Sequence, residues 1–184
     1  MNLQKSWRFI WKAKSKADKL TLVLLVIYLI AIVWILLFKL GVRFSYMEHR
    51  QVNLIPFKDL ILNGKTEYDE SIMNVIIFLP LGIYTGTLFK KWNFSTHMLS
   101  FLILTLIIES IQFTFKIGAF DITDVVTNTL GGIIGFMTYK AILRAFFKQS
   151  KAHNFINLIA AIGSGLMILF LYLLKTNHLG IRYQ

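Results

Sequence analysis

The chain has 184 residues, of which 56% are hydrophobic and only 16% charged, whereas a soluble domain carries roughly a quarter charged residues. Its net charge of +11 comes from basic residues that flank long apolar runs, which argues against nucleic-acid binding and indicates a membrane protein. The chain has no cysteine, which excludes disulfides and thiolate metal sites.

The N-terminal segment, residues 1–19, carries six Lys and Arg residues and precedes the first apolar run, residues 20–38. A spanning helix needs about 20 mainly apolar residues. The run is too long for the apolar region of a signal peptide, and no small-residue cleavage site follows it. We therefore expect a basic cytoplasmic segment followed by an uncleaved first spanning helix.

Later apolar runs predict further spanning helices over residues 72–89, 98–115, 123–142 and 155–174. We thus predict an all-α bundle of about five transmembrane helices, forming a single domain over residues 20–174. A segment at 39–71 and a tail at 175–184 lie outside the bilayer. Lys and Arg residues concentrate before the first helix and after the second and fourth, which predicts a cytoplasmic N-terminus and an external C-terminus.

Two of these runs carry glycines at a spacing of four residues. Gly82 and Gly86 lie in the second run, and Gly131 and Gly135 lie in the fourth. Small residues at this spacing let the backbones of two helices approach closely. We expect both glycine pairs to form helix-packing surfaces.

A carboxylate in the third run is the first candidate for function. Glu109 would cost about 2.5–3.5 kcal/mol at the centre of a spanning helix, so it needs a partner or a polar cavity. Gln112 and Lys116 follow at spacings of three and seven and share its helix face. Two interpretations remain open: an ion pair at the helix end, and a functional carboxylate oriented by Gln112.

The start of the fourth run is rich in polar residues. Asp121 and Asp124 are typical of a helix N-cap followed by an acidic first turn. Asn128 lies one turn deeper and shares a face with Asp124 and the glycines Gly131 and Gly135. We expect this face to pack closely on another helix, with hydrogen bonds across the contact.

The predicted topology places these residues at one level of the membrane. Helices three and four form an antiparallel hairpin, so Glu109, Gln112, Asp124 and Asn128 all fall in its outer half. Asn74 enters the second helix at similar depth, where it either joins this group or caps its own helix. The polar candidates at the outer side are Asn74, Glu109, Gln112, Asp121, Asp124 and Asn128.

The outer segment contains an apolar motif, Asn53-Leu54-Ile55-Pro56-Phe57. Proline makes a helix through this motif unfavourable. We expect the motif to dip into the membrane interface or to cover the polar residues. It could serve as a buried loop plug or as a lid that faces a ligand.

Three blocks make the sequence resemble the VanZ-like family of small bacterial membrane proteins. They are residues 53–57, residues 74–82 (Asn-Val-Ile-Ile-Phe-Leu-Pro-Leu-Gly), and Glu109-x-x-Gln112 followed by residues 121–132. Many members carry an arginine shortly before the position of Asp121, but residues 117–120 contain none. The resemblance implies a helical membrane fold in the plasma membrane, with the polar residues as the functional site. It also implies a link to antibiotic resistance, since one member lowers susceptibility to teicoplanin.

These observations favour a non-enzymatic protein that binds a membrane lipid, a lipid-linked wall precursor or a lipoglycopeptide antibiotic. An alternative is an intramembrane enzyme for isoprenoid or lipid phosphates, in which Glu109, Asp121 and Asp124 act as acid, base or Mg²⁺ ligands. A channel or transporter is the third hypothesis. We expect no cofactor and no metal, and we expect solvated histidines at positions 49, 97, 153 and 178.

Overall fold

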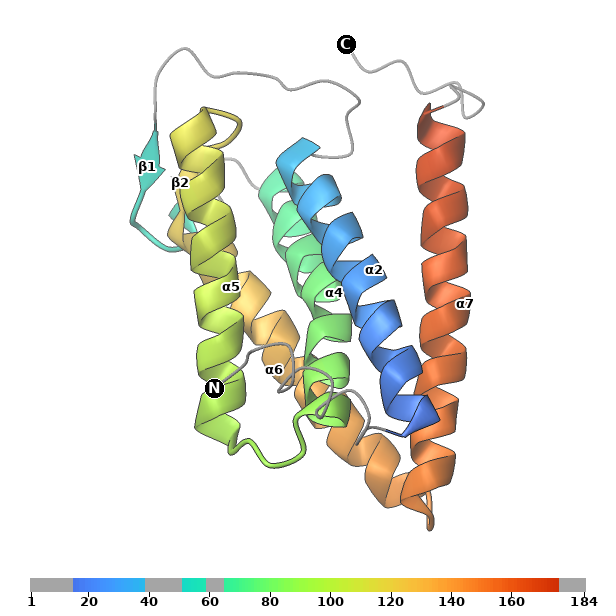
Figure 1. Ribbon diagram of the computed structural model, residues 1–184. Helices are drawn as coiled ribbons and strands as arrows, with labels where there is room; N and C mark the ends of the chain where they lie inside the picture. The colour runs from blue at the N-terminus through green and yellow to red at the C-terminus, as the bar shows by residue number, and fades with distance from the viewer. Residues whose placement is uncertain (1–14, 39–50, 59–64, 176–184) are drawn as a thin grey trace, which may run out of the picture.

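The computed structural model describes residues 15–38, 51–58 and 65–175, and long helices make up most of this part of the chain (Figure 1). They are α2 (Lys16–Phe38), α4 (Lys65–Leu88), α5 (Phe94–Phe115), α6 (Ile122–Ala145) and α7 (Gln149–Lys175). Successive helices run in alternate directions (Figure 1). The end of α5 and the start of α6 therefore lie beside strands β1 and β2, at what we call the strand end of the bundle.

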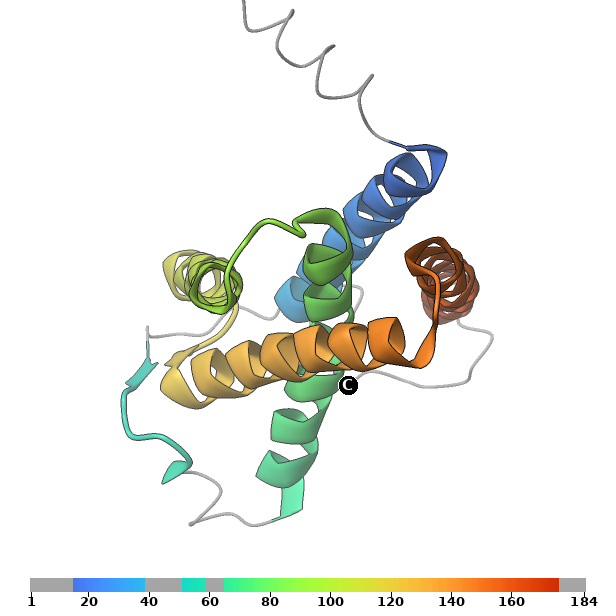
Figure 2. The ribbon, with the colours of Figure 1, turned by 90° about the horizontal axis from the view of Figure 1, so that it is seen from below.

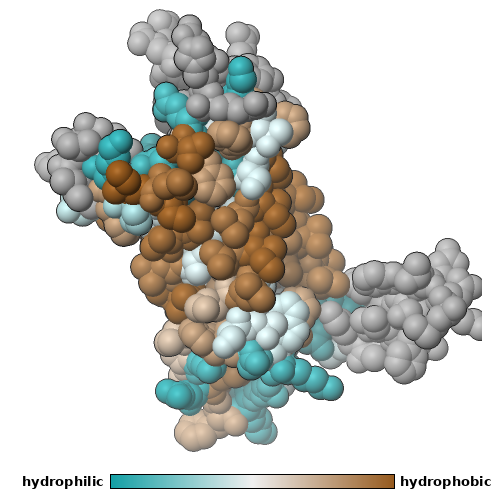
Figure 3. All heavy atoms as spheres, turned by 90° about the vertical axis from the view of Figure 1, so that its left-hand side faces the viewer, coloured by the Kyte–Doolittle hydropathy of each residue, from teal (hydrophilic) through white to brown (hydrophobic). Residues whose placement is uncertain are grey.

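The predicted helical membrane fold is confirmed. Within the described residues, α2, α4, α5 and α7 are each long and apolar enough to cross a membrane. Helix α6 is less apolar because it carries Asp124, Asn128, Lys140 and several glycines, and it lies across α4 (Figure 2). The surface in Figure 3 shows a broad apolar band with hydrophilic residues at both ends, as expected of a protein immersed in lipid.

Several helices extend beyond their apolar runs. Helix α4 begins at Lys65 rather than at residue 72, so part of the predicted outer segment 39–71 is helical. Helix α7 begins at Gln149 rather than at residue 155. Hydropathy marks the part of a helix that lies in lipid, whereas backbone hydrogen bonding continues into the charged turns beyond it. The predicted tail, except for Lys175 at the end of α7, and most of the basic N-terminal segment lie outside the described residues.

A short parallel strand pair, which the sequence did not predict, is present at the strand end. Strand β1 (Val52–Asn53) pairs with β2 (Phe120–Asp121), with Asn53 opposite Asp121. The Phe120 N–H also donates to the Gln51 carbonyl at 3.0 Å. Beyond β1 the chain turns at Pro56, no helix passes through residues 53–57, as the proline predicted, and the pairing holds this segment against the start of α6.

The contact between α4 and α6 is made by glycines. A Cβ atom on Gly82 would overlap the Gly132 carbonyl, and one on Gly135 would overlap the Leu79 carbonyl. Gly131 is held in the same way against the Val75 carbonyl. The two backbones therefore touch at this crossing, and the prediction that these glycines are packing surfaces is confirmed.

The helix contacts bury an aromatic and aliphatic core. Phe78 of α4 and Phe101 of α5 are fully buried, and Ile32 of α2 packs in the same cluster. Apolar side chains also cover the outside, as Ile30 and Leu166 show with 66% and 62% of their surface exposed. In a membrane such side chains contact lipid, so this exposure fits the spanning helices.

Candidate functional site

Polar side chains from four separate parts of the chain meet at the strand end. They come from the β1 segment, from α4, from the last turns of α5 and from the start of α6. We call this group the polar cluster; it consists of Asn53, Asn74, Glu109, Asp121 and Asp124. Asp121 is hydrogen-bonded to Asn53 and Glu109, and Asp124, one turn along α6, is hydrogen-bonded to Asn74.

Asp121 forms the N-cap of α6, as its position in the sequence predicted. Its Oδ1 accepts a hydrogen bond from the Thr123 N–H at 2.7 Å, and its backbone is extended, with φ −117° and ψ 122°. Its Oδ2 accepts from Asn53 Nδ2 at 3.1 Å, and its own N–H donates to Glu109 Oε2 at 3.1 Å. A single capping residue thus links β1, α5 and α6.

Glu109 is the most deeply placed carboxylate of the polar cluster. Only 1% of its surface is exposed, and it points from α5 toward the N-terminus of α6. The backbone dipoles of α6 favour negative charge at that end of the helix. This position gives a buried carboxylate both a hydrogen-bond donor and a favourable field, which it needs in a low-dielectric region.

Asp124 connects α6 to α4. Asn74 Nδ2 donates to Asp124 Oδ1 at 2.7 Å, a short bond to a charged acceptor. Because α4 begins at Lys65, Asn74 lies well inside the helix, so its alternative role as a cap is wrong. Asn74 instead joins the other polar residues, as the first alternative predicted.

The two remaining candidates lie beside the polar cluster. Asn128 is buried between α5 and α6, where its Nδ2 donates to Thr105 Oγ1 at 3.0 Å and its Oδ1 has no hydrogen-bond partner. Gln112 is 5% exposed, and its backbone carbonyl accepts a hydrogen bond of 3.0 Å from the Ile117 N–H at the end of α5. Lys116 forms the C-cap of α5 in the left-handed region, with φ 58°.

Sequence reasoning missed Thr105 and Thr123, which both accept hydrogen bonds here. Thr105 is fully buried and lies one turn before Glu109 on the same helix face. Its spacing of four residues from Glu109 was the available signal. Thr123 could not be found in this way, because its partner, Phe57, is far away in sequence.

The segment with the apolar motif is pinned over the start of α6. Asn53 Oδ1 accepts the Ile55 N–H at 3.3 Å, and the Phe57 N–H donates to Thr123 Oγ1 at 3.0 Å. Phe57 has a φ of 58°, an unfavourable conformation for a bulky residue that its surroundings must hold in place. Leu54 and Ile55 are 66% and 59% exposed, so their side chains point away from the polar cluster.

The prediction of solvated histidines is wrong for the two that the structure describes; positions 49 and 178 lie outside it. His97 is 1% exposed, with its ring 4.3 Å from that of Phe136. His153 is 7% exposed, and its Nε2 lies 2.7 Å from Thr21 Oγ1. Extension of α5 and α7 past their apolar runs turns positions expected in loops into buried helix positions.

His153 belongs to a second polar group, which joins α2 to α7 at the end opposite the strands. Thr21 donates to Asn157 Oδ1 at 2.6 Å, and Asn157 Nδ2 donates to the Ala17 carbonyl at 3.0 Å. We call Thr21, His153 and Asn157 the α2–α7 tie. Among the residues that the structure places, no group of three acidic or histidine side chains is arranged to hold a metal ion.

Comparison of the sequence with known proteins identifies its family. Residues 25–146 match the VanZ/LLP1 family, a range that includes the polar cluster and ends before α7. Protein VanZ of Enterococcus faecium is 38% identical over 164 residues, which cover 87% of this chain and 94% of that protein. No solved structure matches significantly. The chain is therefore a member of the VanZ/LLP1 family.

Proposed function

We propose that the protein lowers susceptibility to teicoplanin-type lipoglycopeptide antibiotics at the outer side of a bacterial plasma membrane. Family membership and the similarity to Protein VanZ support this function. The observation that carries the proposal is the buried Glu109 carboxylate, held in a polar cluster at one end of the bundle. A carboxylate buried in a spanning helix has a cost that function would explain.

The distribution of basic residues supports an outward-facing polar cluster. Lys90 and Lys91, in the turn between α4 and α5, and Arg144 and Lys148, beside the turn between α6 and α7, all lie at the end opposite the strands. Basic loops favour the cytoplasmic side. With that end inside, the N-terminus of α2 faces the cytoplasm and the strand end faces outward.

This orientation has a direct test, because the chain has no cysteine of its own. Lys58 and Lys148 are exposed at opposite ends of the molecule. In intact cells, a membrane-impermeant thiol reagent should label Lys58→Cys and leave Lys148→Cys unlabelled until the membrane is broken. Labelling with the opposite sidedness would overturn the proposed orientation.

The chemical groups of the polar cluster restrict the class of ligand that it could bind. Glu109, Asp121 and Asp124 supply hydrogen-bond acceptors and negative charge, which attract N–H and O–H donors and repel anions. A donor-rich antibiotic, or the peptide part of a wall precursor, fits such a site better than a lipid phosphate does. We infer that binding there keeps the antibiotic from its target.

The test is expression of the chain in a susceptible Gram-positive host. Wild-type protein should raise the inhibitory concentration of teicoplanin several-fold and change that of vancomycin little. Glu109→Gln keeps the shape and the acceptor for Asp121 N–H but replaces the ionisable carboxyl group by a neutral amide, and it should abolish the effect. The matched control is Glu70→Gln, the same change at an exposed position of α4 outside the polar cluster.

Membrane levels of each variant are measured by immunoblotting, so that a lost effect can be separated from lost protein. An unchanged teicoplanin concentration on expression of the wild-type chain would contradict the proposal. Equal effects of wild-type protein and Glu109→Gln would place the activity elsewhere in the molecule.

A further inference from the structure

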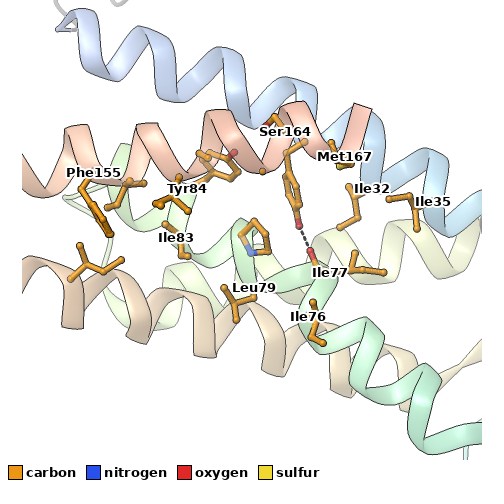
Figure 4. Close-up of a pocket in the computed structure, with 17 residues that line it drawn as sticks. Ile32, Ile35, Ile76, Ile77, Leu79, Ile83, Tyr84, Phe155, Ser164 and Met167 are labelled. Atoms are coloured by element: carbon orange, nitrogen blue, oxygen red, sulfur yellow. Dashed lines mark hydrogen bonds between the residues drawn. The ribbon is translucent and has the colours of Figure 1, made fainter. Parts of the chain in front are cut away.

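A cavity of about 380 Å³ lies between α2, α4 and α7, near the middle of these helices (Figure 4). Tyr28 of α2, Pro80 of α4 and Ser164 of α7 lie on its wall. No residue of the polar cluster lines it. The cavity is therefore a separate feature at mid-membrane depth, and the proposed antibiotic function does not account for it.

The wall is suited to hydrocarbon. None of the lining residues is charged, and isoleucines form much of the surface. The hydroxyl group of Tyr28 is already used, because it donates to the Ile77 carbonyl at 2.7 Å (Figure 4). The other hydroxyl groups on the wall, those of Tyr84 and Ser164, are hydrogen-bonded to each other. Water is held in protein cavities by several polar partners, and this wall leaves few of them available. An occupant of this space must be apolar.

An unfilled cavity of this size would be unfavourable. Protein interiors contain few voids larger than a water molecule, and the loss of stability grows with the volume of an empty cavity. The volume falls within the roughly 300–1,000 Å³ range of sites that hold one small molecule. Both arguments indicate that an apolar molecule occupies the space in the membrane.

The opening of the cavity identifies the source of that molecule. Ile76 of α4 and Ile159 of α7 line the cavity, yet each is 54% exposed. They mark a mouth between two spanning helices, where the wall of the cavity continues into the lipid-facing surface. Neighbouring positions of α7 outside the cavity, such as Ile162, are also exposed and apolar. At this depth the surrounding medium consists of lipid chains.

We propose that this cavity is a lipid site, which takes one acyl chain of a bilayer phospholipid through the mouth between α4 and α7. The acyl chain fills space that no side chain of the described residues fills, and it holds α7 at its distance from α4. The headgroup stays at the membrane surface, because the lining offers it no charged partner. This site exists whether or not the polar cluster binds an antibiotic.

Two glycines of α7 provide a matched pair of variants. Gly163 lines the cavity and Gly165 does not, and a Cβ atom added to either one meets nothing within 4 Å. Both positions can therefore accept a larger side chain without a backbone clash. Gly163→Phe places a ring at the cavity wall, whereas Gly165→Phe adds the same ring elsewhere on the same helix.

The experiment uses the full chain reconstituted in phosphatidylglycerol vesicles that contain a phospholipid with a photoreactive diazirine midway along one acyl chain. After irradiation, mass spectrometry maps the crosslinked residues. We expect the wild-type crosslinks to concentrate on cavity residues, such as Tyr84 and Met167. Gly163→Phe should reduce these crosslinks several-fold, and Gly165→Phe should leave them unchanged.

Crosslinks spread evenly over the lipid-facing helices of the wild-type protein would overturn the proposal, and this outcome needs no variant. An equal loss of cavity crosslinks in both variants would also overturn it, because the loss would not depend on filling the cavity. Thermal melting of each variant in the same vesicles shows whether its fold is intact when the crosslinks are compared.

Discussion

The α4–α6 crossing and helix α7 are packed in opposite ways. At the crossing, Gly82 and Gly135 bring two backbones into contact, so that no added side-chain atom fits. On α7, Gly163 and Gly165 have open space around them. Of the spanning part of α7, 17% is buried, against 44% for α4. The side of the molecule with the α4–α6 crossing is tightly packed, and the side with α7 is open to lipid.

The polar groups on these two sides of the molecule also differ, in whether they include buried carboxylates. The α2–α7 tie consists of a hydroxyl, an amide and an imidazole, and its hydrogen bonds join two helices. The carboxylate beside it, Asp18, lies 3.7 Å from His153 and keeps 24% of its side chain exposed. The polar cluster contains three carboxylates, of which Glu109 is 1% exposed. Joining helices does not require buried charge. This difference supports our proposal that the polar cluster serves function, and it leads us to expect that the α2–α7 tie serves packing.

The largest expected effect is at the α4–α6 crossing. Gly135→Leu would force a side chain into the Leu79 carbonyl and separate the two helices. We expect the free energy of unfolding to fall by more than about 4 kcal/mol, a size that is exceptional for one substitution. This is a large share of the roughly 5–15 kcal/mol that stabilises a typical protein, so the variant should fail to fold. Size-exclusion chromatography of the detergent-solubilised protein measures it. The control Gly165→Leu should elute as the wild type does, and equal behaviour of both variants would contradict the comparison.

The next effect concerns the bond between α4 and α6 at the strand end. Asp124→Ala leaves the Asn74 amide without its charged acceptor. A hydrogen bond to a charged group contributes about 1.5–3 kcal/mol, so the variant should melt at a clearly lower temperature. It should also lose the teicoplanin effect when its membrane level equals that of the wild type. Retained activity at equal levels would remove Asp124 from the functional residues.

Breaking the α2–α7 tie should have a smaller effect, on stability alone. Asn157→Leu removes the bonds to Thr21 and to the Ala17 carbonyl. Hydrogen bonds between membrane helices contribute about 0.6 kcal/mol each on average, so the loss of both bonds should lower the melting temperature only modestly. Antibiotic susceptibility should match that of the wild type at equal membrane level. A teicoplanin effect lost without loss of protein would show that the α2–α7 tie does more than packing.

The smallest effect is expected at the β1 segment. Asn53→Ala removes the bond to Asp121 and the acceptor for Ile55 N–H, both partly exposed to solvent. The cost should be about 1 kcal/mol or less, too small to change expression. The segment should nevertheless open more often, and trypsin should cleave faster after the exposed Lys58. An unchanged cleavage rate would mean that these bonds do not hold the segment.

The glycine contacts of the α4–α6 crossing and the polar cluster were more predictable from sequence than the α7 side of the molecule. Spacings of three and four residues revealed the glycine surfaces and the shared face of Glu109 and Gln112, because helical periodicity is a local property. The cap at Asp121 was predictable for the same reason. Features that join distant segments were not: the two-residue pairing of β1 with β2 is too short for a pattern, and the burial of His153 depends on Thr21, on another helix.

The lipid-facing cavity was also hidden from sequence. Its wall draws apolar residues from several helices, and each of them is ordinary for a spanning segment. The packing of these helices around a shared space turns the residues into the wall of a cavity. The existence and approximate position of each helix could therefore be predicted from its own sequence, whereas the spaces between helices depend on how all of them pack.

The most direct test compares Glu109→Gln with Asn157→Leu in cells that carry equal amounts of each protein in the membrane. The first variant replaces the buried carboxyl group of the polar cluster by an amide, and the second breaks a packing contact at the opposite end. We predict that teicoplanin susceptibility returns to that of cells without the protein only for Glu109→Gln. Full activity of Glu109→Gln, or loss of activity in Asn157→Leu alone, would contradict the assignment of function to the polar cluster.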